Sequence, residues 1–181
     1  MLQYQIKKAD DLQTQEIETI LKHWEIAEWR QLSKEEFKKI FTYAEFHLLT
    51  DENFKILAVA RINFDFKIKV EDQIYEIAEL VGLVAIEKRS GYGRKLLQEI
   101  VTNLKNRNIE AIGFCEKENR PFYYKCQIWN MRDQAKQLRE PAGEKWLIPE
   151  DDDVLDINLS EKNALLLQSL SPDKLGYLLF A

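Results

Sequence analysis

Residues 87–100, with the sequence EKRSGYGRKLLQEI, decide the fold of this chain. A basic segment that contains Gly91 and Gly93 runs directly into an amphipathic pattern. The apolar residues recur at helical spacing, which predicts a helix. Its apolar stripe consists of Leu96, Leu97, Ile100, Val101 and Leu104. We expect the helix to end at Asn106 and Asn108.

Strands are predicted on both sides of this segment. Residues 74–86 predict a strand that becomes buried on both faces near Val81, and residues 109–114 (IEAIGF) predict a second core strand. The order strand, loop, helix, strand is typical of a crossover unit, so the two strands should be parallel neighbours. The loop then lies at the carboxyl end of a central strand, where α/β sheets usually bind their ligands.

The chemistry of the loop favours a phosphate. Its two glycines permit close backbone approach and positive φ, and the helix N-terminus offers unpaired N–H groups. Positive charge comes from Lys88, Arg89, Arg94 and Lys95. The alternative is a glycine-rich helix start with solvated basic side chains. The segment is not a Walker loop, and the dinucleotide pattern GxGxxG fails at its last glycine.

The N-terminal half predicts two helices and a hairpin. A first helix carries Leu12, Ile17, Ile20, Leu21 and Trp24 at helical spacing. Ser33 and Glu36 form a capping-box pair before a second helix, whose Phe37, Ile40 and Phe41 should point inward. Residues 54–70 alternate between apolar and polar, which predicts one long strand with a solvated face that includes Arg61. A turn at residues 71–73 joins it to the strand at residues 74–86.

Composition narrows the classes of function. The chain has 181 residues, 45% of them hydrophobic and 31% charged, as expected for one globular domain. A net charge of -5 argues against nucleic acid as the main partner. The longest apolar run, residues 80–86, is too short to span a membrane, and no signal-peptide core follows Met1, so we expect a cytoplasmic protein. No metal-ligand spacing occurs, and Cys115 and Cys126 are interpreted as buried thiols or as thiols without a functional role.

A second segment, residues 115–129 (CEKENRPFYYKCQIW), adds a family resemblance. The GCN5-related N-acetyltransferase (GNAT) superfamily is marked by [RQ]xxGx[GA] at a helix start and, after the next strand, by an Asn and an FYxKxGF-like segment. KRSGYG at residues 88–93 and NRPFYYKCQI at residues 119–128 resemble these two motifs, in the right order. The resemblance covers residues 12–129. It implies an α/β fold with a mixed central sheet and helices on both faces.

The resemblance also implies roles for individual residues. The loop would bind the pyrophosphate of acetyl-CoA, and the preceding strand would hydrogen-bond the pantetheine arm. The implied cofactor-binding residues are Val81, Leu83, Ala85, Lys88, Arg89, Ser90, Gly91, Tyr92, Gly93, Arg94 and Asn119. Tyr123 would be the general acid that protonates the departing thiolate. Its alternative role is that of a packed helix tyrosine.

The general base is less well defined by the sequence. Glu76 and Glu79 lie on one predicted strand and should point to opposite faces. We favour Glu79, which shares a face with Val81 and Leu83, although a bulge would reverse that choice. Phe114 occupies the place where some family members carry an acid. Gln127 and Ile128 replace the usual Gly-Phe pair, so the backbone there is expected to turn differently.

The C-terminal part is harder to interpret. Residues 138–146 (LREPAGEKW) predict a hairpin tip, and residues 154–159 (VLDINL) a strand. The acidic segment EDDD at residues 150–153 is either a rim that attracts a cationic substrate or an ordinary solvated turn, and the solvated turn is favoured. We assign residues 1–160 to the GNAT-like domain. Residues 161–181 form a helical tail that packs on the same domain or contributes to a homodimer contact.

The resemblance therefore implies an acetyl-CoA-dependent N-acetyltransferase, and the sequence predicts that it binds no metal and does not act on nucleic acid or at a membrane. Its acceptor would be the primary amine of a small molecule or peptide. Two alternatives remain. One is an inactive module that still binds acyl-CoA, and the other is a GNAT-fold domain that binds another protein.

Overall fold

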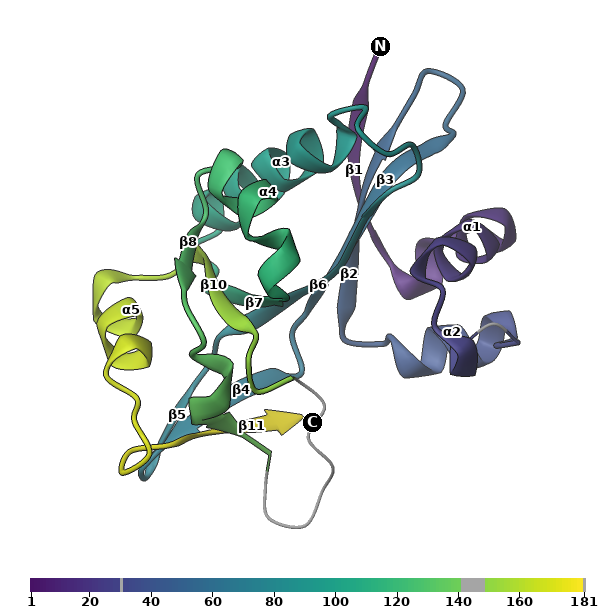
Figure 1. Ribbon diagram of the computed structural model, residues 1–181. Coiled ribbons are helices and arrows are strands. Elements are labelled where there is room, and N and C mark those ends of the chain that lie inside the picture. Colours follow the sequence, from purple (N-terminus) through teal and green to yellow (C-terminus); the bar gives the residue numbers. More distant parts are fainter. Residues whose placement is uncertain (30, 141–148, 181) are drawn as a thin grey trace. The chain divides into compact units, whose positions relative to one another are not determined.

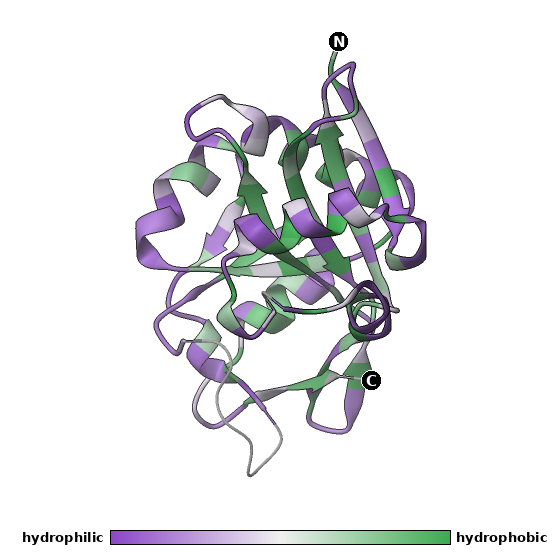
Figure 2. Cartoon of the chain, turned by 90° about the vertical axis from the view of Figure 1, so that its right-hand side faces the viewer, coloured by the Kyte–Doolittle hydropathy of each residue, from purple (hydrophilic) through white to green (hydrophobic). Residues whose placement is uncertain are grey.

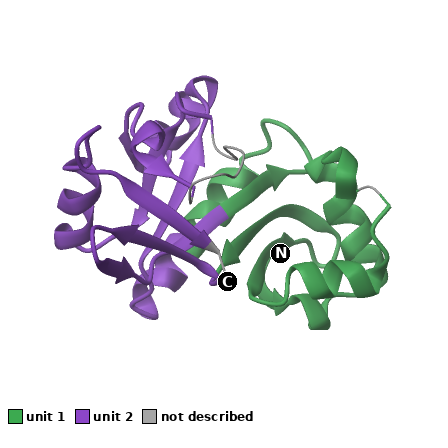
Figure 3. Cartoon of the chain, turned by 90° about the horizontal axis from the view of Figure 1, so that it is seen from below, with its two compact units in different colours: residues 1–63, 81–100 green, residues 64–80, 101–181 purple. Residues whose placement is uncertain are grey.

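The computed structural model describes residues 1–29, 31–140 and 149–180 (Figure 1). The chain divides into two compact units, Met1–Asn63 with Val81–Ile100, and Phe64–Leu80 with Val101–Ala181 (Figure 3). Strand β6 (Ala78–Ala85) and helix α3 (Tyr92–Asn106) each contribute residues to both units. Of the predicted hairpin tip at residues 138–146, residues 141–146 lie outside the described residues.

Seven strands form a mixed sheet in the order β1-β2-β3-β6-β7-β10-β8. β6 and β7 are parallel, with Ala78 opposite Ala111 and Leu80 opposite Gly113, which confirms the predicted crossover around α3. Figure 2 shows that the sheet strands are mostly hydrophobic, whereas the helices carry both hydrophobic and hydrophilic residues. The other strands of this sheet are β1 (Gln3–Lys8), β2 (Ala44–Thr50), β3 (Ile56–Asn63), β7 (Ala111–Cys115), β8 (Trp129–Met131) and β10 (Asp153–Asn158).

The first unit packs α1 (Thr14–Trp24) and α2 (Lys34–Ile40) against β2 and β3. The predicted capping box is present, because Glu36 N donates to Ser33 Oγ at 3.2 Å and Ser33 N donates to Glu36 Oε2 at 2.8 Å. Phe37 and Phe41 are buried as expected, but Ile40 is 49% exposed because it lies on the outer side of α2. His47 is fully buried and bonded to Tyr4, in keeping with a structural role.

The prediction of one long strand at residues 54–70 is wrong. The chain forms β3 in the large sheet, bends at residues 64–65, and continues as β4 (Phe66–Val70) in a second sheet of order β5-β4-β11-β9. β3 has no solvated face, since residues 56–62 are all buried. The strand predicted at residues 74–86 is likewise divided into β5 (Gln73–Tyr75) and β6. β4 and β5 do form an antiparallel hairpin, with Ile68 opposite Tyr75.

The second unit contains α4 (Arg120–Lys125), α5 (Glu161–Gln168), β9 (Leu138–Arg139) and β11 (Gly176–Phe180). α5 begins at Ser160, whose Oγ accepts from Asn163 N at 3.3 Å, as expected for an N-cap. The predicted helical tail at residues 161–181 contains the strand β11 after the helix α5. β11 pairs antiparallel with β4 and parallel with β9. Leu178 is buried in the core of this unit, and Tyr177 is 39% exposed.

Candidate functional site

The loop between β6 and α3 has an unusual backbone. Arg89 has φ +63° and Gly91 has φ +84°, so two left-handed residues flank Ser90. Ser90 Oγ donates to the Glu87 carbonyl at 2.6 Å and accepts from Tyr92 N at 3.4 Å, which fixes the turn. Backbone of alternating hand directs successive N–H groups toward the same side, and such concave surfaces bind anions.

Helix α3 extends this surface. The Gly91 carbonyl accepts from Lys95 N at 3.0 Å, so Gly91 is the N-cap and the next N–H groups, including those of Gly93 and Arg94, have no acceptor within the helix. A Cβ on Gly91 would meet no atom within 4 Å, so the space beside the loop is open. The N-terminus of this 15-residue helix carries partial positive charge. The loop can therefore hold a phosphate.

The basic side chains of the loop are available for an anion. Lys88, Arg89 and Arg94 are exposed, and none forms an ion pair within the described residues. Lys95 differs, because its Nζ lies 2.7 Å from Glu99 Oε1. Three unpaired cations at the start of α3 add to the helix dipole.

Strand β6 leads into this loop and is itself accessible. Residues 81–86 are all half-buried, although β6 is an interior strand of the large sheet. Gly82 has φ +68°, which interrupts the regular alternation of the strand. Val81, Leu83 and Ala85, the residues predicted to bind an extended ligand arm, thus lie on a partly exposed segment.

The two candidate bases do not share a strand, contrary to the prediction. Glu76 lies in the break between β5 and β6 and pairs with Lys67 at 2.8 Å, with 71% of its side chain exposed. Glu79 is in β6, half-buried, and opposite Ile112 of β7. The alternation that relates Glu79 to Leu83 passes through the left-handed Gly82, so a shared face no longer follows from spacing. Glu79 as the base stays a prediction.

In the second unit, α4 carries Tyr123. Burial, together with the nearby Cys115 and Cys126 thiols, raises the pKa of the Tyr123 phenol above its ordinary value. The phenol is therefore a neutral hydrogen-bond donor at physiological pH. Burial, with the Asp153 carboxylate, also raises the pKa of Cys115 to about 12, so this thiol is not a nucleophile. Both cysteines are buried free thiols, as expected.

The C-terminal end of α4 is a Schellman turn. Ile128 N donates to the Tyr123 carbonyl at 3.0 Å and Gln127 N donates to the Tyr124 carbonyl at 3.0 Å. Gln127 has φ +62°, the left-handed conformation in which glycine is usual. The expected difference in the turn is thus not found: Gln127 adopts the conformation that glycine would supply.

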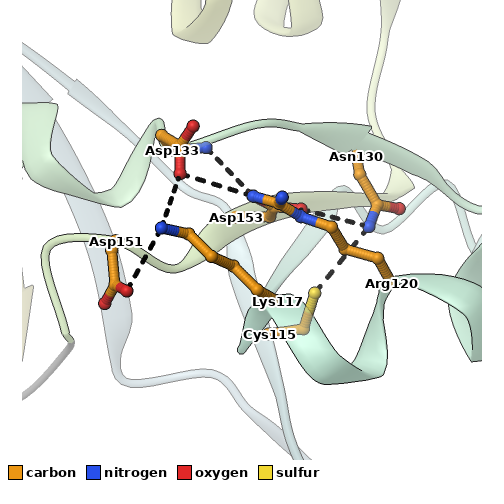
Figure 4. Close-up of polar contacts among 7 residues, drawn as sticks. All are labelled: Cys115, Lys117, Arg120, Asn130, Asp133, Asp151 and Asp153. Atoms are coloured by element: carbon orange, nitrogen blue, oxygen red, sulfur yellow. Dashed lines mark hydrogen bonds and ion pairs between the residues drawn. The ribbon is translucent and has the colours of Figure 1, made fainter.

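An ion-pair network anchors α4 to β10 (Figure 4). Arg120 donates from Nε to Asp153 Oδ2 at 2.7 Å and from its terminal nitrogen to Asp153 Oδ1 at 2.6 Å. Asp133 N also donates to Asp153 Oδ1 at 2.9 Å, and Lys117 lies between Asp133 and Asp151 at 3.6 and 3.3 Å. The interpretation of residues 150–153 as a solvated turn is therefore wrong for Asp152 and Asp153, which are 7% and 0% exposed.

Comparisons with solved structures identify this arrangement of elements. A GNAT family N-acetyltransferase (YhbS) from Escherichia coli, solved in complex with CoA, superposes with a TM-score of 0.60 at 13% identity, covering 100% of this chain and 89% of that one. An acetyltransferase from Bacillus subtilis in complex with CoA gives 0.54 at 13% identity, covering 88% and 100%. A putative acetyltransferase from Acinetobacter baylyi gives 0.56 at 12% identity, covering 88% and 93%.

The chain has the GNAT fold. The predicted fold class is thereby confirmed, and the resemblance is confirmed at the level of the fold. No protein-family model matches the sequence, and no curated protein matches it.

The predicted phosphate-binding residues of the loop are contiguous, whereas Asn119 belongs to the other unit. Residues 88–94 form one loop and helix start in the first unit, in which residues 88–91 and Arg94 are exposed, Tyr92 is half-buried and Gly93 is buried. Asn119 precedes α4 in the second unit, is exposed, and makes no capping hydrogen bond with its side chain. Phe114 packs edge-to-face with Phe66, so no acid stands at that position. The described residues contain no group of three His, Cys, Asp or Glu that could hold a metal ion, and no helix long and apolar enough to cross a membrane.

Sequence reasoning missed two parts of this arrangement. One is the Arg120–Asp153 pair, whose only sequence signal was a run of acids with no visible partner. The other is a cluster of rings in the first unit, where the Arg61 guanidinium lies 4.5 Å from the centre of the Phe41 ring and 5.5 Å from that of Trp24. Arg61 is 9% exposed, although the alternating pattern places it on a solvated face.

Proposed function

We propose that this protein is an N-acyltransferase that uses acetyl-CoA as its acyl donor. The observation that carries the proposal is the loop at residues 88–94, where left-handed Arg89 and Gly91, the N-terminus of α3 and three unpaired cations meet. A pyrophosphate carries the charge and the acceptor oxygens that such a surface binds. The GNAT fold, and the complexes of two similar structures with CoA, support this choice of ligand.

The pantetheine arm would extend along β6. It contains two amide groups, which can hydrogen-bond to a strand as a peptide does, and residues 81–85 are partly open to a ligand. In this arrangement the acyl thioester lies beyond the arm, further from the phosphates. Asn119 would contribute a polar contact to the cofactor.

The proposed reaction is direct attack by an amine. The nitrogen lone pair of the amine forms a bond to the thioester carbonyl carbon, the C–S bond then breaks, and the thiolate leaves. Glu79, directly or through water, accepts the proton that the amine loses, because amines are mostly ammonium at neutral pH. Tyr123 donates a hydrogen bond to the sulfur as negative charge develops there and passes it the proton, which solvent then replaces. Burial raises the pKa of the phenol, which keeps the hydroxyl a donor at neutral pH but makes it a weaker acid.

Calorimetric titration of the protein with acetyl-CoA tests the proposal. We expect micromolar binding that is lost with S-acetylpantetheine, which has the same arm without the pyrophosphate. The double variant Arg89→Glu, Arg94→Glu should weaken binding by roughly tenfold or more per charge. Lys39→Glu, a charge reversal at one exposed position of α2, is the control for the effect of each reversal. Absence of binding to the wild-type protein at millimolar acetyl-CoA would exclude the proposal.

An inactive acyl-CoA-binding module is the second candidate. Phe114, half-buried and packed against Phe66, leaves Glu79 as the one candidate base on β6 and β7 that the sequence suggested. This alternative predicts the same binding of acetyl-CoA as the acyltransferase, but no acetyl transfer. It requires that no amine in a broad panel, including polyamines, aminosugars and peptide N-termini, releases free CoA from acetyl-CoA faster than water does.

A further inference from the structure

The indole of Trp24, the last residue of α1, is bonded to the irregular residue of β6. Trp24 Nε1 donates to the Gly82 carbonyl oxygen at 2.8 Å, across 58 residues of sequence. Gly82 is the residue of β6 with a left-handed backbone, at φ +68°. The hydrogen bond and the distortion of the strand therefore occur at the same residue.

The ring of Trp24 is held firmly. It stacks on Phe46 with ring centres 6.0 Å apart and meets Phe41 edge-on at 5.8 Å. The Arg61 guanidinium lies 5.5 Å from its centre on a buried cation–π contact. These contacts are all made within the first unit, and they leave the indole N–H little freedom of direction.

Gly82 is fitted to this ring. A Cβ at Gly82 would lie 2.8 Å from two atoms of the Trp24 indole, so no side chain can occupy the position without displacing the ring. The positive φ independently favours glycine. The hydrogen bond and the steric fit thus select one orientation of the peptide that joins Gly82 to Leu83.

That orientation has a consequence for the next N–H. The C=O and N–H of a trans peptide point in opposite directions. Because the Gly82 carbonyl points at Trp24, the Leu83 N–H of the same peptide points away from Trp24. In a regular strand both groups would lie along the direction of the neighbouring strands instead.

We infer that Trp24 is a positioning residue, which orients the Gly82–Leu83 peptide so that its N–H donates to the thioester carbonyl of bound acetyl-CoA. The inference rests on the proposed function, because it needs acyl-CoA on β6. A preorganised backbone donor of this kind stabilises the negative charge that develops on the carbonyl oxygen during attack. Trp24 acts through the peptide and does not touch the reacting atoms.

Infrared spectroscopy of acetyl-CoA labelled with carbon-13 at the thioester carbonyl tests this role without an acceptor. A hydrogen bond from the protein weakens the C=O bond and lowers its stretching frequency. The variant Trp24→Phe keeps a ring and removes the donor. Trp29→Phe is the matched control, because Trp29 belongs to the same ring cluster and its indole makes no hydrogen bond within the described residues.

We expect wild type and Trp29→Phe to lower the carbonyl frequency of bound acetyl-CoA, and Trp24→Phe to leave it near the value in water. The affinity of Trp24→Phe for CoA, which has no acetyl group, should stay within about twofold of wild type, since the phosphate loop is unchanged. A structural role alone would lower the melting temperature of both variants and leave the frequency shift in each.

A lowered frequency in Trp24→Phe would overturn the inference, as would an unshifted frequency in a wild-type protein that binds acetyl-CoA. Failure of the wild type to bind CoA would overturn the proposed function first, so the two failures are distinguishable. If Trp24→Phe does not fold, replacing the Trp24 indole by benzothiophene, which has sulfur in place of N–H, removes the donor with the ring shape retained. The same two outcomes then decide.

Discussion

Arg120 of α4 forms two hydrogen bonds to Asp153 of β10, at 2.7 and 2.6 Å, and Asp153 is fully buried. The pair joins a six-residue helix, too short to be stable alone, to a strand of the large sheet. Because α4 carries Tyr123, this ion pair sets the position of the proposed acid.

Replacing Asp153 by Ala should destabilise the protein by about 3 kcal/mol, because Arg120 and Asp133 N would lose a buried acceptor. Urea unfolding measures the change. Asp151→Ala is the control, since Asp151 is exposed and its pair with Lys117 should contribute less than about 1 kcal/mol. Equal losses in the two variants would show that the Arg120–Asp153 pair does not anchor α4.

The buried Asp152 carboxyl group predicts that the stability of the protein depends on pH. Burial, and the nearby Glu116, Asp151, Asp153 and Glu118 carboxylates, raise its pKa above the ordinary value of 3.8. A carboxyl group with a raised folded-state pKa destabilises the fold when ionised, and that penalty disappears as the pH falls through the folded pKa toward 3.8. Asp152→Asn should therefore stabilise the protein at pH 7 and have little effect near pH 4.

The measurement is urea unfolding of Asp152→Asn and of wild type at both pH values. Asp153 behaves in the opposite way, which makes it an internal comparison. Burial alone would raise the pKa of Asp153, but hydrogen bonds from Arg120, Asp133 N and Asn130 lower it. Asp153 therefore stabilises the fold at pH values above its ordinary pKa of 3.8, and this contribution is lost as the pH falls through the lowered pKa. A stability gain for Asp152→Asn that is equal at pH 7 and pH 4 would contradict the prediction.

Gln127→Gly should stabilise the protein by about 0.5 to 1 kcal/mol. Gln127 has φ +62°, where a side chain costs about 1 kcal/mol or more, and glycine removes this strain at some cost in chain entropy. Thermal unfolding gives the sign directly. Gln98→Gly, in the interior of α3, is the matched control and should destabilise by about 1 kcal/mol. A lower melting temperature for Gln127→Gly would show that the Gln127 side chain is needed in place.

The sequence predicted the region around α3 well because several independent signals agree there. The helical spacing, the two glycines and the flanking apolar runs each indicate the same crossover unit, and the structure has it. The bend at residues 64–65, between β3 and β4, could not be predicted in the same way. The alternation of apolar residues continues from β3 through Phe64 and Phe66 into β4 without a glycine or proline, so nothing local marks the passage from one sheet to the other.

Contacts between distant residues account for the other errors. Asp153 belongs to a run of acids that is typical of solvated turns, and its burial depends on Arg120, which lies 33 residues away. Arg61 alternates with apolar residues as a solvated side chain would, yet rings from α1 and the end of α2 surround it. In both cases a charged side chain is buried because of a partner that local periodicity does not reveal.

Tyr123→Phe tests the proposed acid. If Tyr123 protonates the leaving thiolate, kcat should fall by about 10² to 10⁴ with any amine that the wild type acetylates. Affinity for CoA should be unchanged, because the substitution removes only the hydroxyl oxygen and keeps the ring. Tyr124→Phe is the matched control, since Tyr124 is the next residue of α4 and is 82% exposed. Wild-type rates in Tyr123→Phe would leave the tyrosine with a packing role only.

Arg89→Gly separates binding from stability at the phosphate loop. Arg89 has φ +63°, a conformation that strains any residue with a side chain, and it is exposed, so glycine should raise the free energy of unfolding by about 0.5 to 1 kcal/mol. The same substitution removes a cation beside the proposed pyrophosphate and should weaken acetyl-CoA binding by about tenfold. Lys88→Gly removes an equal charge one residue earlier, where φ is not positive, and should weaken binding without raising stability.

Opposite changes in stability and affinity for Arg89→Gly, measured by urea unfolding and calorimetry, are expected if the strained conformation is retained for ligand binding. A loss of stability in Arg89→Gly would mean that the Arg89 side chain stabilises the loop and that its left-handed backbone is no sign of function.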